Sequence, residues 1–230
     1  ACNPVKYLTE NQVLLNKNII QTKDKKLKSE VETIIKQKPN RKMLGLFRLD
    51  LRVYNLANKG KQSKFKSWIK RTIGEAPVLL DTVLTNRSVR QLQLYLQNTG
   101  YFNASVRDSI IIKKKQANVY YIINPGNPYV IRNINYEIKD SLLLSVVMSG
   151  IDKSHLKTAD HYNADILMKE RDRIANDFKN QGYYYFSKEY ISFKIDSSLN
   201  SRQLDIFLNI RKPENAERLF KVYTINNLFV

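Results

Sequence analysis

The chain has 230 residues, of which 43% are hydrophobic, so it is long enough for one large or two modest domains with cores of their own. Its formal net charge is +18, and residues 1–76 hold 18 Lys or Arg against 6 Asp or Glu, so the first third should attract anions. The single cysteine, Cys2, excludes an intrachain disulfide, and the longest apolar runs are far shorter than the roughly 20 residues of a membrane-spanning helix.

The first half of the chain shows the spacing of helices and strands in a clear order. Apolar residues that alternate predict strands, and apolar residues three or four apart predict helices. The predicted elements are a strand at 12–20, helices at 24–37 and 86–99, and strands at 103–112 and 117–123. The first helix is expected to begin at Asp24. In the second, Ser88 with Gln91 fits a capping box, although Thr85 could equally be the cap.

An insertion rich in Lys and Arg separates these two helices, at about residues 38–78. Its apolar side chains can share a helical side with cations around them, as in helices that lie at a membrane surface. The candidate membrane-proximal residues are Arg41, Lys42, Phe47, Arg48, Arg52, Lys66, Trp68, Lys70 and Arg71. A helical hairpin that packs on its own domain, with its lysines solvated, explains the same pattern, and both interpretations stay open.

The second half repeats the order of the first. The predicted elements are a strand at 129–138, helices at 140–149 and 164–181, and strands at 185–195 and 203–211. Residues 219–230 are predicted to begin another strand after a break at Lys212-Pro213.

A self-comparison supports a repeated domain of about 80 residues. Residues 87–102 (RSVRQLQLYLQNTGYF) and 169–184 (KERDRIANDFKNQGYY) are both helix-like and both end in Asn-x-Gly-Tyr-aromatic. Gly100 and Gly182 are expected to adopt the left-handed backbone conformation that ends many helices, because glycine does so at little cost.

The βααββ order, closed by Gly-Tyr-aromatic, resembles the POTRA domain of the BamA/TamA outer-membrane assembly superfamily. Residues 88–106 (SVRQLQLYLQNTGYFNASV) and 119–134 (VYYIINPGNPYVIRNI) carry the resemblance, which covers nearly the whole chain. It implies an α+β fold of tandem POTRA domains, each with a three-stranded mixed sheet covered by two helices. The expected parts are a lipid-anchor segment at 1–10, a first domain at 11–126, a second at 127–213, and the start of a further unit at 214–230.

Cys2 follows a small residue near the start of the chain and looks like the end of a bacterial lipobox. With the basic insertion, it resembles the TamA-like lipoproteins of Gram-negative bacteria. That resemblance implies an acylated Cys2 and a location on the periplasmic side of the outer membrane. It also implies a C-terminal barrel, which this sequence lacks. A free thiol at Cys2 is the alternative.

The resemblance implies a binding function rather than catalysis. In this fold the second strand lies at a sheet edge, where an unfolded outer-membrane protein could add a further strand. The candidate edge residues are Ala104, Val106, Ile110, Ile112, Tyr185, Ile191, Phe193 and Ile195. Other subunits of an assembly machine are the further partners implied. Charged residues in the same strands are consistent instead with an edge that is protected from pairing.

Little in the sequence points to other chemistry. His155 and His161 could join Asp160 or Asp165 on a metal, but the spacing gives no support, and solvated loop residues are the default. No cofactor and no enzymatic activity are expected. The alternative function is a basic protein that binds nucleic acid or an anionic membrane. Nucleic-acid binding is disfavoured because aliphatic residues occupy the alternating strand positions where stacking aromatics and cations are needed.

Overall fold

The computed structural model describes residues 5, 8–41, 75–198, 201–212 and 220–227. It divides into two compact units, one of residues 1–95 and 104–125 and the other of residues 96–103 and 126–230. Each unit holds one three-stranded sheet and two helices in its described part.

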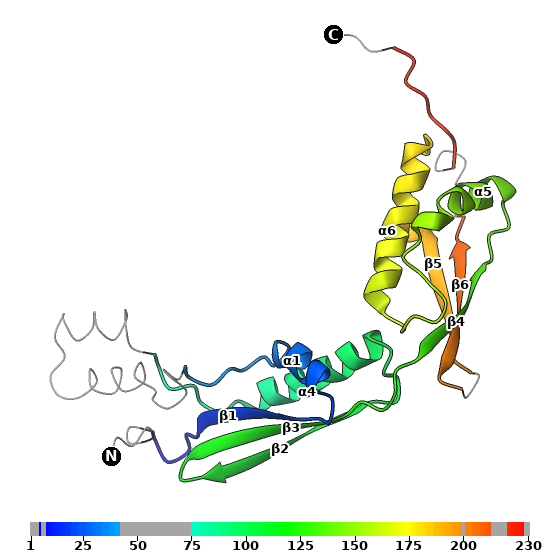
Figure 1. The fold of residues 1–230 in the computed structure, drawn as a ribbon. Coiled ribbons are helices and arrows are strands. Elements are labelled where there is room, and N and C mark those ends of the chain that lie inside the picture. The colour runs from blue at the N-terminus through cyan, green and yellow to red at the C-terminus, as the bar shows by residue number, and fades with distance from the viewer. Residues whose placement is uncertain (1–4, 6–7, 42–74, 199–200, 213–219, 228–230) are drawn as a thin grey trace. The chain divides into compact units, whose positions relative to one another are not determined.

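The first unit contains β1 (Leu14–Gln21), α1 (Lys25–Glu32), α4 (Thr82–Asn98), β2 (Ser105–Lys113) and β3 (Gln116–Asn124). The strand order is β1-β3-β2, with β1 parallel and β2 antiparallel to β3. Both helices lie on one face of this sheet, as Figure 1 shows. The central position of β3 agrees with its apolar sequence.

The second unit contains β4 (Val130–Tyr136), α5 (Ser141–Ser149), α6 (Ala164–Asn180), β5 (Ile191–Asp196) and β6 (Gln203–Ile210). Its strand order is β4-β6-β5, again with one parallel and one antiparallel pairing. The structure therefore confirms the predicted α+β fold, with a βααββ order in both units.

Three predicted boundaries were wrong by more than two residues, and one predicted strand does not form. Helix α1 ends at Glu32 rather than at 37, and α4 begins at Thr82 because the Asp81 carboxylate accepts the N–H groups of the first turn. Strand β5 begins at Ile191 rather than at 185, after a 3-10 turn. Residues 220–227 form no strand in the described structure, where they have no strand beside them to pair with.

The predicted cap residues of α4, Ser88 and Thr85, lie inside that helix. Their hydroxyl groups donate to main-chain carbonyls one turn earlier, at Leu84 and Asp81. Ser88 Oγ also accepts the Lys36 N–H at 3.0 Å. Ser88 therefore joins the helix to the segment that follows α1, and neither residue starts the helix.

Gly100 and Gly182 hold equivalent places at the ends of α4 and α6. Their φ angles are +91° and +90°, which confirms the predicted left-handed conformation. The Gly100 carbonyl accepts the Tyr129 N–H at 2.9 Å, and the Gly182 carbonyl accepts the Tyr223 N–H at 2.8 Å. In both repeats, the carbonyl of the glycine after the second helix thus accepts a hydrogen bond from a later tyrosine N–H.

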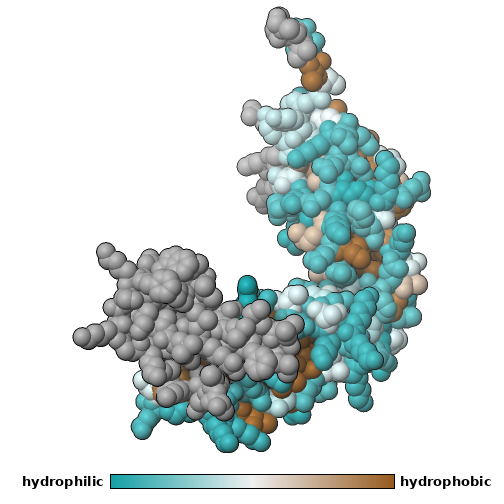
Figure 2. Space-filling model, turned by 60° about the vertical axis from the view of Figure 1, so that its left-hand side comes forward, coloured by the Kyte–Doolittle hydropathy of each residue, from teal (hydrophilic) through white to brown (hydrophobic). Residues whose placement is uncertain are grey.

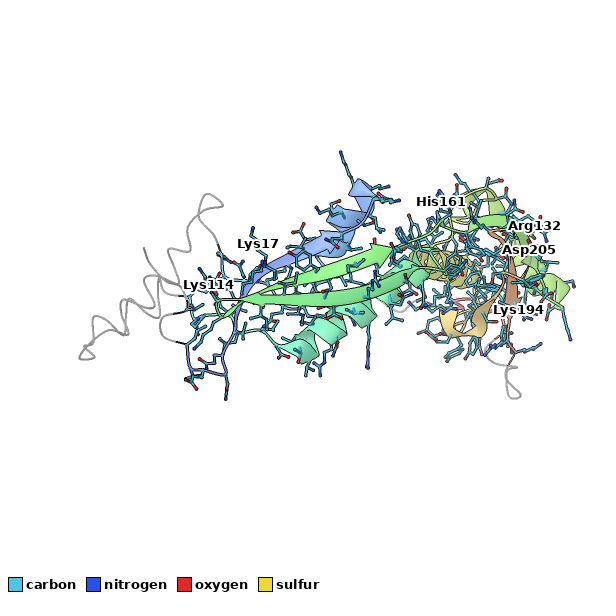
Figure 3. The ribbon with its side chains drawn as sticks, turned by 90° about the horizontal axis from the view of Figure 1, so that it is seen from below. Lys17, Lys114, Arg132, His161, Lys194 and Asp205 are labelled. Atoms are coloured by element: carbon cyan, nitrogen blue, oxygen red, sulfur yellow. The ribbon has the colours of Figure 1, made fainter. Side chains whose placement is uncertain are left out.

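A bulge in the first strand of each sheet is fixed by a polar pair. Asn16 donates to the Asn118 side chain at 2.7 Å, next to the break in register of β1. Arg132 sits at the equivalent break in β4 and binds both Asp205 oxygens, at 2.9 and 2.5 Å. Figure 3 shows Arg132 and Asp205 side by side. The repeat therefore preserves the polar contact while changing the residues that make it.

A buried carboxylate organises the helical layer of the second unit. Glu170, in α6, is 0% exposed and accepts the His155 N–H at 2.7 Å and the Ser154 hydroxyl at 2.9 Å. Arg173 donates to the same carboxylate at 2.6 and 3.1 Å, and also to Asp177 at 2.6 Å. The network ties the loop after α5 to α6.

Candidate functional site

Strand β2 forms one free edge of the first sheet. It runs for nine residues and pairs only with β3 in the described structure. An edge strand leaves every second pair of main-chain N–H and C=O groups without a partner inside the sheet. This strand can therefore bind an extended chain through its backbone.

The turn between β2 and β3 determines which backbone groups point outward. Lys114 and Lys115 have φ angles of +49° and +59°, so they form a two-residue hairpin turn. The flanking pair, Lys113 and Gln116, then exchanges both hydrogen bonds, and such pairs recur at every second residue. The outward groups therefore belong to four residues: Val106, Asp108, Ile110 and Ile112. Three of these are among the predicted site residues.

The side chains of those residues lie on the helix-covered face of the sheet. Ile110 is opposite the buried Val119, and Val106 is opposite the buried Ile123. Near the hairpin turn the helices cover less of the sheet, and the Ile112 side chain is 53% exposed. Ala104, also predicted, is buried just before the strand begins.

A charge interrupts this apolar series at Asp108, opposite Tyr121. Tyr121 is buried, and burial raises the pKa of its hydroxyl, with a smaller contribution in the same direction from the Asp108 carboxylate. An inward-facing charge on an edge strand weakens uncontrolled pairing between copies of a protein. The β2 edge can therefore pair with an added strand, while Asp108 disfavours pairing between copies of the protein.

Strand β5 forms the corresponding edge of the second sheet but is shorter, with six residues. Ile191 is buried, and the Arg171 guanidinium lies 5.7 Å from the Phe193 ring centre. Ile195 packs with the core cluster around Leu204. Tyr185 was expected in this strand but lies before it, 51% exposed. Of the two edges, β2 offers the longer ladder.

The predicted membrane-proximal residues and Cys2 lie outside the described residues, except for Arg41. The Arg41 N–H donates to the Glu75 carboxylate at 3.0 Å, across the base of the insertion. Just inside it, the buried Asn40 amide bonds to the Ala76 carbonyl at 2.7 Å and to the Val78 N–H at 2.9 Å. The two ends of the insertion are therefore clamped together.

The described residues hold neither a candidate metal site nor a helix that could span a membrane. It contains no group of three or more His, Cys, Asp or Glu side chains placed to hold a metal ion. Among the same residues, no helix has the length and apolar character needed to cross a membrane. His155 uses its main-chain N–H to bind Glu170, and His161 forms an isolated bridge with Val130.

Sequence reasoning missed the polar contacts that shape these units. Glu170, Arg173 and Asp177 stand three and four residues apart, which was the available signal for a helical ion-pair network. The amide clamp at Asn40 had no comparable signal, because its partners are backbone groups 36 and 38 residues away.

Part of the chain matches a protein-family model, and its fold resembles several solved structures. Residues 16–126 match the family model POTRA, described as surface antigen variable number repeat. POTRA1-2 of the periplasmic domain of Omp85 from Anabaena is 13% identical with a TM-score of 0.45, over 90% of this chain and 100% of that one. BamA from Haemophilus ducreyi lacking POTRA domains 1-3 is 17% identical with a TM-score of 0.38, over 66% of this chain and 27% of that one.

No curated protein matches the sequence.

Proposed function

Because residues 16–126 match the POTRA family model and the chain carries the βααββ fold twice, we propose that it is the client-binding arm of an outer-membrane protein assembly or translocation system. On this proposal it works in the periplasm and binds unfolded chains by strand addition rather than catalysing a reaction. The client adds to β2, and β5 is the second, shorter edge.

This proposal rests on one observation: β2 pairs with β3 on one side, and in the described structure no strand pairs with its other side. Its outward backbone groups, at Val106, Asp108, Ile110 and Ile112, recur with the two-residue period of an extended peptide. Main-chain hydrogen bonds give affinity with little demand on client sequence, which suits a protein that handles many unfolded chains.

The test is a proline substitution that blocks the edge without breaking the sheet. Proline lacks an N–H, so Ile110→Pro removes an outward donor, whereas Ser109→Pro removes a donor to β3. A synthetic peptide of alternating Val and Thr should slow hydrogen exchange at Ile110 and Ile112 in the wild-type chain. Ile110→Pro should remain folded and lose this protection, while Ser109→Pro should destabilise the first unit. A peptide that binds both wild type and Ile110→Pro equally would overturn the proposal.

The narrower proposal is a TamA-like lipoprotein anchored through Cys2. Two features support it: the small residue before Cys2, as at the end of a lipobox, and the basic insertion. Several acyl chains on Cys2 would hold the arm at the membrane surface. Intact-mass measurement of protein purified from native membranes should show acylation of Cys2, and an unmodified Cys2 would exclude it.

The segment from Phe220 onward supports a further unit. Tyr223 binds the Gly182 carbonyl as Tyr129 binds that of Gly100, and Thr-Ile-Asn-Asn follows Tyr223 where Val-Ile-Arg-Asn follows Tyr129. Ile131 is 3% exposed in the core of its unit, whereas the matching Ile225 is 88% exposed. If a further unit is present after residue 227, hydrogen exchange at Ile225 should be as slow as at Ile131. Fast exchange there would refute a further unit.

A further inference from the structure

The sheet of the first unit has a face that its helices do not cover. Helices α1 and α4 lie on one side, and Figure 3 views the strands from the other side, with Lys17 and Lys114 labelled. Burial alternates along β3, where Ala117, Val119, Tyr121 and Ile123 are buried on the helix side. The residues between them form what we call the outer face. With their paired neighbours, and with Lys113 at the end of β2, they are Lys17, Ile19, Gln21, Arg107, Ser109, Ile111, Lys113, Asn118, Tyr120 and Ile122.

The centre of the outer face is apolar. Tyr120 lies in the middle strand, directly opposite Ile19 of β1. Ile122 is two residues further along β3, and Ile111 of β2 lies diagonally from Tyr120 and is 42% exposed. Side chains at these spacings lie within reach of one another across strands, so the four form one patch over three strands. Figure 2 shows other apolar patches as brown areas on a mainly hydrophilic surface.

The second sheet provides an internal control for this patch. The register places Asn135, Phe207, Asn209 and Asp196 where the first sheet has Ile19, Tyr120, Ile122 and Ile111. Three apolar positions have therefore become polar or charged, and Lys194 lies over the remaining ring, 5.7 Å from its centre. The βααββ fold does not require an apolar outer face, so the patch needs a reason of its own.

The charges on the two outer faces differ in the same way. The first carries Lys17, Arg107 and Lys113 and no carboxylate among its described residues, because Asp108 faces the helices. The second balances Arg132 and Lys194 against Asp196 and Asp205, and two of these four form an ion pair. An apolar centre with a rim of one charge is typical of a binding surface for a partner of opposite charge.

We propose that the outer face of the first sheet binds an acidic polypeptide segment that presents apolar side chains to Tyr120 and its neighbours. A second copy of the chain would bring the same cations together, so like charge disfavours it. The insertion is disfavoured for the same reason, because residues 42–74 hold nine Lys or Arg and one Asp. The site is separate from the β2 backbone edge and depends on side chains of the central strand.

The probe is a short fluorescent helix-forming peptide with leucines along one side and glutamates elsewhere, compared with a version in which lysine replaces glutamate. The acidic peptide should bind the full chain, more weakly at high salt, and shift the amide signals of β3 and β1. Tyr120→Ser with Ile122→Thr should weaken binding at least about tenfold, as loss of central interface residues does. Lys17→Glu should also weaken it.

The matched control is Phe207→Ser, the equivalent change on the second sheet, which should leave peptide binding unchanged. Ile110→Pro should also leave it unchanged, so failure of strand addition and failure of this proposal are distinguishable. Equal binding of acidic and basic peptides, or equal effects of the changes on the two sheets, would overturn the proposal. Binding to anionic lipid vesicles that depends on Tyr120 and Ile122, without binding to the acidic peptide, would overturn it as well.

Discussion

Replacing Glu170 with glutamine should destabilise the second unit far more than its size change suggests. The wild-type carboxylate accepts four hydrogen bonds, two from Arg173 and one each from Ser154 and the His155 N–H. A glutamine amide accepts through one oxygen only, and its NH2 group would face donors. Arg173 would lose its buried counter-charge.

The magnitude follows from the burial of this ion pair. Breaking a buried pair by removing one partner costs about 3–5 kcal/mol. Arg173 keeps its second bond to Asp177 at 2.6 Å, which places Glu170→Gln near the lower end, at about 3 kcal/mol. Since about 1.4 kcal/mol is a tenfold change, the opening equilibrium should rise roughly 100-fold.

Native-state hydrogen exchange, measured by mass spectrometry, gives the opening equilibrium of each unit separately. Peptides from β6 report the second unit, and peptides from β3 serve as an internal reference. The control is Asp172→Asn, which breaks the Lys188 ion pair between side chains 44% and 51% exposed and should change little. Comparable exchange rates for Glu170→Gln and Asp172→Asn would refute the reasoning.

The destabilisation caused by Glu170→Gln should depend on pH. Burial raises the pKa of Glu170, but the bonds from Arg173 and the His155 N–H together outweigh burial and hold that pKa below its ordinary value of 4.5. A lowered pKa gives stability that is present above pH 4.5 and is lost as the pH falls through the folded value. The gap in unfolding free energy between wild type and Glu170→Gln should therefore narrow below pH 4.5, and a constant gap would contradict this cause.

Three smaller changes test local features by urea denaturation. Gly182→Ala should lower the free energy of unfolding more than Gly126→Ala does. Both glycines have a positive φ, but only at Gly182 would the new Cβ meet a neighbour, the Val222 side chain at 2.9 Å. Equal losses of stability would refute the steric reason. Asp140→Ala should cost about 1 kcal/mol by removing the cap of α5, and Asp140→Asn should restore most of it. Lys114→Asn should stabilise the first unit by up to about 1 kcal/mol, because asparagine tolerates the left-handed turn better, and destabilisation would contradict the turn assignment.

Periodicity predicted the order of elements because it reports which side chains are buried. The alternation in β6 and the spacing in α6 survive in the structure as buried Leu204, Ile206, Leu208, Ile174 and Phe178. Boundaries failed where apolar residues are buried without continuing the element. Ile35 is 4% exposed although α1 has already ended, and Phe186 is 1% exposed in the chain before β5.

The candidate edge was predictable because an edge follows from topology, and topology follows from element order. The polar contacts were not predictable, because a charged residue on a helix is normally expected to face solvent. Glu170 is buried only because a loop fifteen residues earlier supplies an N–H and Arg173 supplies a counter-charge. Such long-range pairing leaves no period in the sequence.

The two repeats separate what the fold needs from what it does not. Both keep the left-handed glycine after the second helix, the polar pair at the first-strand bulge, and a second strand whose outer edge is unpaired among the described residues, so these features belong to the βααββ architecture. They differ in edge length and in the residues of the outer face. Since the fold tolerates either choice, the longer β2 edge and the apolar centre around Tyr120 are the features that selection for binding can explain, and both lie on the first unit.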